Sequence, residues 1–470
     1  MNATSISRRL AGPPLACRPR TLACPGARSS ALPRRTPVLV ASASKSGLGD
    51  TAPAQAAPTA DDAGASVSSP SMWTSDESGD DDQYLESPAV KDCVVFIDRD
   101  DQMVPILCCD YGFRSGTGRM YQDADGKLPD SALAIGWANF KTELEALRRS
   151  LRYDEFSVIS KANPATGVLG KAVYAVGGGL RSLLSKLDRS LEGGGVLKTL
   201  EPPDDTDDVA DVVSDCSMVQ ENLKKLTLSN DAVWAREHKR EDQGSGVETP
   251  WVVRVVYIAL CVFLDIFYDK RPIQRFWFLE TVARMPYFSY ISVLHLYESL
   301  GWWRAGAELR KVHFAEEWNE LTHMQIMESL GGDQLWVDRF MGQHAAIVYY
   351  WILVVMYMGA PKLAYNFSEL IEAHAVDTYG EFADANKDLL KTLPPPIVAA
   401  QYYSSKDLYL FQEFQTSEEG ARRRPKCASL YDVFCNIRDD EGEHVKTMRA
   451  CQDMSVINDL SERRRRGRMV

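Results

Sequence analysis

The chain has 470 residues, of which 45% are apolar, and a formal net charge of −12 at pH 7. This length and composition fit a globular protein of two or three domains. The negative charge argues against nucleic acid as a partner, because binding to a phosphate backbone needs a basic surface. None of the ten cysteines forms a Cys-x-x-Cys pair, so zinc ribbons and thioredoxin-like chemistry are unsupported and mostly reduced thiols are expected.

Residues 1–48 have the composition of an organelle transit peptide. They contain eight Lys or Arg residues, no Asp or Glu, and no continuous apolar segment of the kind found in secretory signals. A disordered basic arm is the alternative. Residues 49–83 are mainly Ala, Ser, Thr, Pro and Asp, which predicts a disordered acidic linker that cannot bury enough apolar surface to fold.

Residues 84–250 predict a mixed extension of unknown role. The segments 92–98 and 104–113 contain β-branched runs typical of strands, and 131–152 has apolar residues at helical spacing with arginines near its end. The glycine triplets 177–179 and 193–195 are predicted to form turns. A docking or regulatory module and a loosely ordered insertion both remain possible for this extension.

Two apolar segments in residues 251–455 suggest contact with a membrane. The segment 252–271 is interrupted by Arg254 and Asp265, and 345–360 has sixteen residues without a charge. A helix of that second length spans roughly 24 Å, less than the roughly 30 Å hydrocarbon core of a bilayer. We therefore expect two interfacial helices that lie in one leaflet and anchor a monotopic protein, with buried core helices as the alternative. Residues 456–470 form a basic C-terminal tail.

Two Glu-x-x-His steps carry the chemistry of this region. Glu320 with His323, and Glu441 with His444, each place a carboxylate and an imidazole on one face of a helix. In ferritin-like bundles, two such steps and one Glu from each of two other helices point inward and hold two metal ions. Here the single glutamates are Glu280 and Glu372. The order along the chain therefore predicts an all-α, ferritin-like four-helix bundle with a di-iron carboxylate centre.

The charges and ligand types support this metal prediction. Four carboxylates balance two divalent cations, and carboxylate with imidazole ligands suits iron or manganese better than structural zinc. Each single assignment has competitors close in sequence, namely Glu298, Glu316, Glu317, Glu328 and Glu369. Tyr379 follows Glu372 by two helical turns, so it is either a redox-active tyrosine beside the metals or an ordinary core tyrosine.

At these residues the sequence resembles the alternative oxidase family, and within it the plastid branch of terminal oxidases that oxidise plastoquinol. The motifs that carry the resemblance are LETVARMPYF (279–288), LHLYESLGWWR (294–304), HFAEEWNELTHMQIMESLGG (313–332), IEAHAVDTY (371–379), DLYLFQEFQT (407–416) and LYDVFCNIRDDEGEHVKTMRACQ (430–452). The likeness covers about residues 250–455.

The resemblance implies roles for individual residues. The six metal ligands of the family match the six residues already named, and the family's candidate redox tyrosine matches Tyr379. Residues matching Arg275, Leu279, Ala375 and Thr378 would line a quinol pocket near the membrane. Mitochondrial relatives have a glutamate at the position of His374, so their proton path and head-group contacts are not transferred to this chain.

The resemblance also implies an activity. It indicates oxidation of two plastoquinol molecules with reduction of one O2 to two waters at two iron ions, without proton pumping. It further implies a monotopic protein of the chloroplast thylakoid membrane, a possible homodimer, and a role in chlororespiration and carotenoid desaturation. Two alternatives use the same ligands: a di-iron hydroxylase or desaturase, and a ferritin-like iron-binding bundle without enzymatic activity.

Overall fold

The structure is a computed structural model, and it describes the greater part of the region from 95 to 456. The described residues are 95–97, 103–107, 109–113, 130–152, 168–200, 218–303, 306–404, 425–453 and 455–456. The predicted transit peptide, linker and most of the basic tail lie outside these residues. Apart from one small hairpin, the described elements are helices, which confirms the prediction of an all-α fold.

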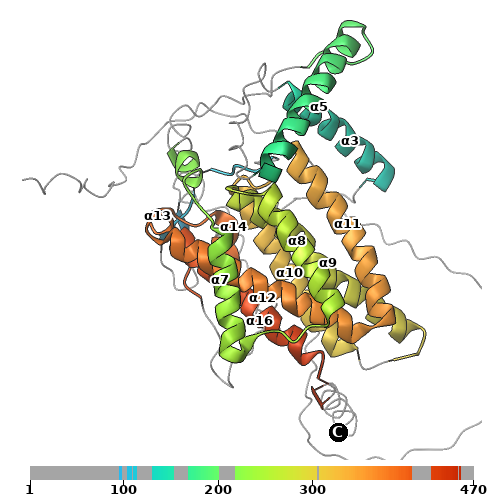
Figure 1. Cartoon of the computed structure of the whole chain (residues 1–470), viewed down its shortest axis with the longest axis vertical. Coiled ribbons are helices and arrows are strands. Elements are labelled where there is room, and N and C mark those ends of the chain that lie inside the picture. Colours follow the sequence, from blue (N-terminus) through green and yellow to red (C-terminus); the bar gives the residue numbers. More distant parts are fainter. Residues whose placement is uncertain are drawn as a thin grey trace, which may run out of the picture. The chain divides into compact units, whose positions relative to one another are not determined.

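Four long helices form the bundle at the centre of the molecule (Figure 1). They are α9 (Pro272–Ser299), α10 (Ala307–Ser329), α12 (Pro361–Ala385) and α16 (Leu430–Ala450). Helix α9 packs along α10, and α12 packs along α16. Proline at the first position of α9 and of α12 fits the start of a helix, where a backbone N–H has no partner within the helix. Each of the four carries one part of the predicted metal site.

An aromatic core fixes one end of the bundle. The rings of Phe276 and Tyr379 stack with their centroids 4.3 Å apart, and Phe382 packs edge-on against Phe276 and Phe434 at 5.0 and 4.6 Å. These residues come from α9, α12 and α16. Because edge-to-face and offset aromatic pairs are geometrically specific, this cluster fixes how the three helices face one another.

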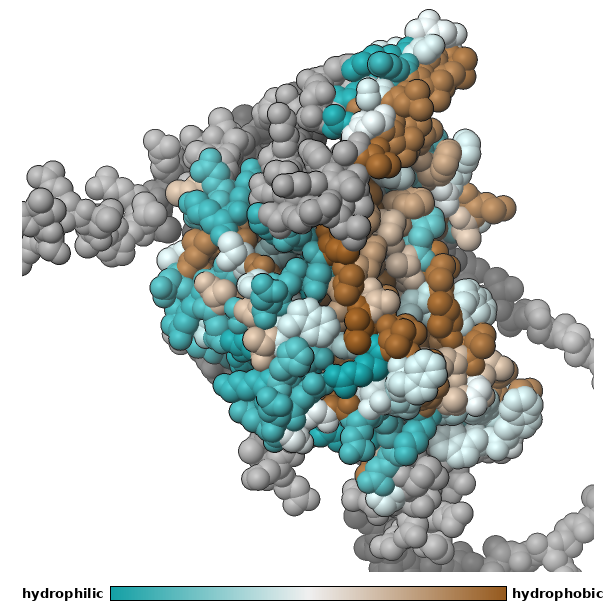
Figure 2. Space-filling model, in the orientation of Figure 1, coloured by the Kyte–Doolittle hydropathy of each residue, from teal (hydrophilic) through white to brown (hydrophobic). Residues whose placement is uncertain are grey.

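Helices α8 (Trp251–Phe267) and α11 (Trp336–Gly359) carry the two apolar segments. Helix α11 packs along α9, and α8 contacts α12. Both helices leave large apolar side chains exposed, and Figure 2 shows hydrophobic surface gathered on this side of the molecule. Among the described helices, α11 is the one long and apolar enough to cross a membrane by length and composition.

The extension contributes a hairpin and several helices. Strands β1 (Val95–Ile97) and β2 (Met103–Pro105) pair antiparallel, as the β-branched runs predicted. Helix α3 (Ala132–Leu151) is also confirmed, and Arg148 within it pairs with Asp188 of α5 (Val168–Gly193) at 2.6 Å.

The turns expected at the two glycine triplets are confirmed in part. Gly194 and Gly195 lie in the turn that follows α5, whereas Gly177–Gly179 and Gly193 lie within this helix. Each helical glycine costs roughly 1 kcal/mol relative to alanine, and the amphipathic pattern of this 26-residue helix outweighs that cost. Among the described cysteines, Cys109 is disulfide-bonded while Cys261, Cys427, Cys435 and Cys451 are free, which agrees with the expectation of mostly reduced thiols.

The remaining helices are shorter. Helix α7 (Asn230–Arg240) continues into a π-helical turn, η1 (Glu241–Ser245), and packs on α12. Helices α13 (Lys387–Leu390) and α14 (Ile397–Ser404) follow α12, and α14 contacts α10.

Candidate metal centre

The six predicted ligands come from the four bundle helices and meet in the interior. Their elements are α9 for Glu280, α10 for Glu320 and His323, α12 for Glu372, and α16 for Glu441 and His444. All six residues are buried, with at most 2% of their surface exposed. The spacing of three residues in each Glu-x-x-His step places both groups on the inner face, as helical geometry requires.

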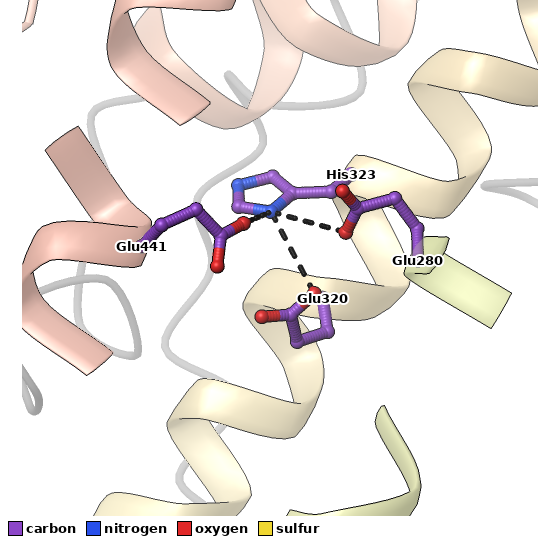
Figure 3. Close-up of side chains that lie close together, drawn as sticks. All are labelled: Glu280, Glu320, His323 and Glu441. Atoms are coloured by element: carbon purple, nitrogen blue, oxygen red, sulfur yellow. Dashed lines mark ion pairs between the residues drawn. The ribbon is translucent and has the colours of Figure 1, made fainter. Parts of the chain in front are cut away.

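The first half of the site gathers around His323 (Figure 3). Its Nδ1 atom lies 3.2 Å from Oε1 of Glu441, 3.6 Å from Oε2 of Glu280 and 3.8 Å from Oε2 of Glu320. One possible ligand atom from each of these four residues lies within 4.8 Å of the other three, which is close enough for all four to hold a single metal ion.

The second half of the site gathers around His444. Its Nδ1 atom lies 2.9 Å from Oε1 of Glu320, 3.5 Å from Oε2 of Glu441 and 3.9 Å from Oε2 of Glu372. These four residues form a second group of the same kind. Glu320 and Glu441 therefore belong to both groups, while Glu280 and Glu372 each belong to one. Two metal ions could be held here, with Glu320 and Glu441 shared between the two groups and Glu280 and Glu372 each contributing to one.

Unsatisfied buried atoms support a cation at this position. Oε2 of Glu280, both carboxylate oxygens of Glu320, Nδ1 of His323 and Oε1 of Glu441 are buried and make no hydrogen bond. Unpaired buried polar atoms cost roughly 1–3 kcal/mol each, and more when charged. Oxygen and imidazole nitrogen donors that face one another in a dry interior fit two divalent cations.

Burial and the mutual repulsion of the carboxylates shift their pKa values. Burial, together with the neighbouring Glu441 and Glu280, raises the pKa of Glu320 well above its ordinary value. Burial likewise raises the pKa of Glu372 to about 8, partly offset by His444. For Glu441 the effect of burial is outweighed by the adjacent imidazoles of His323 and His444, and its pKa is lowered. Cations at the centre would keep all four carboxylates ionised.

Side chains outside the candidate ligand set hold His323 in place through hydrogen bonds. Its Nε2 atom lies 3.2 Å from Oδ2 of Asp440, which also accepts hydrogen bonds from Tyr403 of α14 at 2.7 Å and from Asn319 at 3.1 Å. Such contacts orient a ligand imidazole and set which nitrogen faces the metal. The sequence analysis did not predict these outer partners. The signal that could have found two of them is their position, because Asn319 and Asp440 directly precede the candidate ligands Glu320 and Glu441.

Each of two buried tyrosines donates a hydrogen bond to a candidate ligand on another helix of the bundle. Tyr379 donates a hydrogen bond to Oε1 of Glu280, and Tyr287 donates one to Oε1 of Glu372 at 2.8 Å. Each tyrosine follows the other single glutamate of the site by seven residues, so the spacing argument that selected Tyr379 also fits Tyr287. Burial, and then the adjacent carboxylate, raises the pKa of both phenols well above the ordinary value, which keeps them protonated.

The competing glutamates lie outside both ligand groups. Their printed partners are, in order, Arg310 for Glu298, His313 for Glu316, Arg284 for Glu317, Trp277 for Glu328, and Arg449 and Gln452 for Glu369. Among the other histidines, His295 and His344 are exposed, while His313 is buried against Tyr365 at 3.0 Å. Geometry therefore separates the six candidates from their neighbours.

An apolar cavity of about 310 Å³ reaches the metal ligands. Its walls come from α8, α9, α11 and α12, with Glu441 of α16 at one point, and Glu280, Glu372 and Tyr379 also lie along it. The other lining side chains are almost all apolar. A hydrophobic molecule that enters between the two exposed apolar helices would thus meet the carboxylates directly.

Comparison with known proteins identifies the family to which the chain belongs. The family model for alternative oxidase matches residues 249–453. The chain is 47% identical over 246 residues to ubiquinol oxidase 4, chloroplastic/chromoplastic, of Arabidopsis thaliana, and this match covers 51% of the chain and 70% of the relative. The chain belongs to the alternative oxidase family.

More distant members of the alternative oxidase family match a shorter part. The mitochondrial ubiquinol oxidase of Mangifera indica is 29% identical over 199 residues, which cover 41% of the chain and 54% of the relative. Ubiquinol oxidase 1b, mitochondrial, of Oryza sativa subsp. japonica is 28% identical over 204 residues, which cover 41% and 51%. No solved structure matches the chain.

The four residues expected to line the quinol pocket of this alternative oxidase divide into two pairs. Leu279 and Ala375 line the apolar cavity. Arg275 and Thr378 are buried but are not among its lining residues: Arg275 donates to Asp265 at 2.9 Å, and Thr378 donates to a backbone carbonyl of its own helix.

Proposed function

We propose that this protein is a quinol oxidase that couples oxidation of two quinols to reduction of O2 to water at two iron ions. The observation that carries the proposal is the apolar cavity, because it joins the exposed apolar helices to the carboxylates and to Tyr379. The names of the relatives, all ubiquinol oxidases here, agree with this chemistry.

The chain would hold the irons with Glu280, Glu320, His323, Glu372, Glu441 and His444. Bound there, two iron ions would supply the O2 binding and electron transfer that side chains alone cannot provide. The protein excludes bulk water from the site by burying every ligand. Tyr379 lies on the cavity wall and its phenol donates a hydrogen bond to Glu280, so it is placed to supply a proton and an electron between quinol and metal.

The substrate would reach the cavity from a lipid leaflet. Exposed side chains on α8 and α11 include Trp251, Val255, Trp351 and Val355, with between 58% and 76% of their surface accessible. Trp251 lies at the first residue of α8, as expected for an aromatic anchor at a lipid–water interface. We propose that these faces lie in the membrane without crossing it, which gives an isoprenoid quinol a short lateral path to the cavity.

The finer points of the proposal rest on the likeness to the plastid branch. They are plastoquinol as donor, the thylakoid membrane of the chloroplast as location, participation in chlororespiration and carotenoid desaturation, absence of proton pumping, and a homodimer. The relative with 47% identity is named chloroplastic/chromoplastic, which supports the plastid location.

Oxygen uptake by the purified protein tests the activity. With a short-chain plastoquinol as the sole reductant, we expect two quinols to be lost for each O2, with no modified organic product. Glu372→Ala should abolish uptake, whereas Glu369→Ala, three residues earlier on the same helix but paired with Arg449, should keep most of it. Oxygen consumption with a hydroxylated or desaturated product would instead indicate a hydroxylase or desaturase. Iron binding without any quinol-dependent uptake would indicate a storage bundle.

A further inference from the structure

Helix α7 lies before the residues that the family model matches, yet it packs against the cavity region. The matched residues begin at 249, whereas α7 ends at Arg240. Its outer residues pair with α12: Arg240 with Asp377 at 2.9 Å and Arg236 with Glu381 at 2.7 Å. These ion pairs fix the position of α7 on the bundle and direct its other face inward.

The inward face of α7 carries a buried carboxylate, Glu237. Only 2% of its surface is exposed. Its Oε2 atom accepts a hydrogen bond from Tyr257 of α8 at 2.5 Å and lies 3.0 Å from Nδ1 of His374 on α12. These hydrogen bonds, opposed by burial, lower the pKa of Glu237, so it is ionised. A buried charge is tolerated when it is paired, and here the partners come from two other helices.

His374 connects this carboxylate with the cavity. The imidazole lines the cavity, and Cys261 of α8 lies beside it. Nδ1 faces both Glu237 and Tyr257, at 3.0 and 2.9 Å, whereas Nε2 is buried and makes no hydrogen bond. Trp234 of α7 packs on the ring with centroids 5.7 Å apart. The ring is thus held from the α7 side and leaves one nitrogen for a molecule in the cavity.

We propose that Glu237 is a positioning residue of the quinol site. It holds Nδ1 of His374 so that Nε2 is available to hydrogen-bond an oxygen of the quinol head group. In a cavity whose lining is otherwise apolar apart from the metal ligands and a few hydroxyls, this single imidazole nitrogen fixes the orientation of the ring. The proposal rests on the proposed function, and it extends the site to a helix that precedes the residues matched by the family model.

Asn230 at the start of α7 supports the same role for the helix. Its Oδ1 atom accepts a hydrogen bond from Nη1 of Arg275 at 2.7 Å, and Arg275 lies on α9 one turn before the cavity residue Leu279. Helix α7 therefore contacts both α9 and α12 close to the cavity, and it does so through polar side chains rather than through packing alone.

The test uses the purified full chain with its iron, and titrates it with decyl-plastoquinone to measure a dissociation constant directly. Glu237→Gln should weaken binding about three- to tenfold, the value of one hydrogen bond. The KM for the quinol should rise by a similar factor, with kcat within about twofold. Iron content should stay unchanged. Lys239→Gln is the matched control, because it removes one charge from the exposed side of the same helix without touching His374, and it should bind as the wild type does.

A double-variant cycle separates positioning from structural support. His374→Phe keeps a ring but removes the nitrogen, and it should weaken binding by a similar factor. If Glu237 acts through His374, the double variant should be no weaker than His374→Phe alone. Unchanged binding in Glu237→Gln, or two fully additive effects, would overturn the proposal. If Glu237→Gln does not fold, the His374→Phe variant still tests the proposal, because unchanged binding in that variant would also overturn it. A wild-type protein that neither binds nor oxidises quinol would instead reject the proposed function.

Discussion

Oε1 of Glu441 lies 3.2 Å from Nδ1 of His323, although the two residues come from helices α16 and α10, which lie far apart in the sequence. Because Glu441 also approaches His444, it belongs to both halves of the centre. Glu280, in contrast, belongs to the His323 half alone. The two kinds of carboxylate should therefore respond differently to substitution.

Glu441→Ala should lose both iron ions, whereas Glu280→Ala should keep about one per chain. Both variants should lose at least about 100-fold in quinol oxidation, since O2 reduction between two metals needs both of them. Iron per chain, measured by elemental analysis after gel filtration, distinguishes the two. Two irons retained in Glu441→Ala would contradict the bridging assignment.

Tyr379 and Tyr287 provide a matched pair of phenols. Both are buried and both donate to a ligand carboxylate, but Tyr379 lines the cavity and Tyr287 does not. Tyr379→Phe should lower kcat by at least about tenfold while iron content is preserved, because it removes the hydroxyl that lies between the cavity and Glu280 and is proposed to supply a proton and an electron. Tyr287→Phe should mainly affect stability. Equal losses of kcat in the two variants would show that neither phenol is distinguished by its access to the cavity.

Part of the candidate ligand set could be predicted from the sequence because it depends on local spacing. Two residues three apart share a helix face whatever the tertiary structure, so Glu320 with His323 and Glu441 with His444 could be paired from the sequence alone. The same reasoning selected Tyr379, and applied to Glu280 it would have selected Tyr287.

Other features depend on contacts between distant segments and have no local signal. Tyr403 reaches Asp440 only because α14 packs against the bundle, and Glu237 reaches His374 across 137 residues of chain. The glycines of α5 show the opposite limit. Local propensity predicted turns there, while the amphipathic pattern of the whole segment favours a helix.

Removal of the metals should make stability depend on pH in a defined direction. In the metal-free fold, burial raises the pKa of Glu372 from 4.5 to about 8. For His323, burial acts in the lowering direction, but Glu280 and Glu441 raise the pKa from 6.5 to about 9. Groups with a raised folded-state pKa stabilise the fold below their unfolded pKa, and this contribution is lost as pH rises through the folded value.

The chelated protein should therefore melt at a lower temperature at pH 8.5 than at pH 5.5, by about 5 °C or more. The lowered pKa of Glu441 acts in the opposite direction, but only below pH 4.5, outside this interval. Protein with bound iron should show a smaller difference, because the cations keep the carboxylates ionised at both pH values. Glu372→Gln in the metal-free state should also reduce the difference. A metal-free melting temperature that rises from pH 5.5 to 8.5 would contradict this account.

The exposed apolar face of α11 should determine binding to lipid. Trp351 and Val355 have 61% and 69% of their surface exposed, so charged residues can replace them without disturbing the core. Trp351→Glu with Val355→Glu should lower partitioning into liposomes by at least about 100-fold, since each apolar side chain contributes about 1.5–3 kcal/mol when buried in an apolar phase. Oxidation of a water-soluble quinol analogue should be preserved, because neither residue lines the cavity. Lys446→Glu on α16 changes the net charge by the same amount and should leave partitioning nearly unchanged.

Labelling with an impermeant thiol reagent distinguishes a helix that lies on the membrane surface from one that crosses the bilayer. Cysteines placed at Trp336 and Gly359, the two ends of α11, should both react from the outside of the vesicle. Reaction at one end only would show that α11 crosses the bilayer.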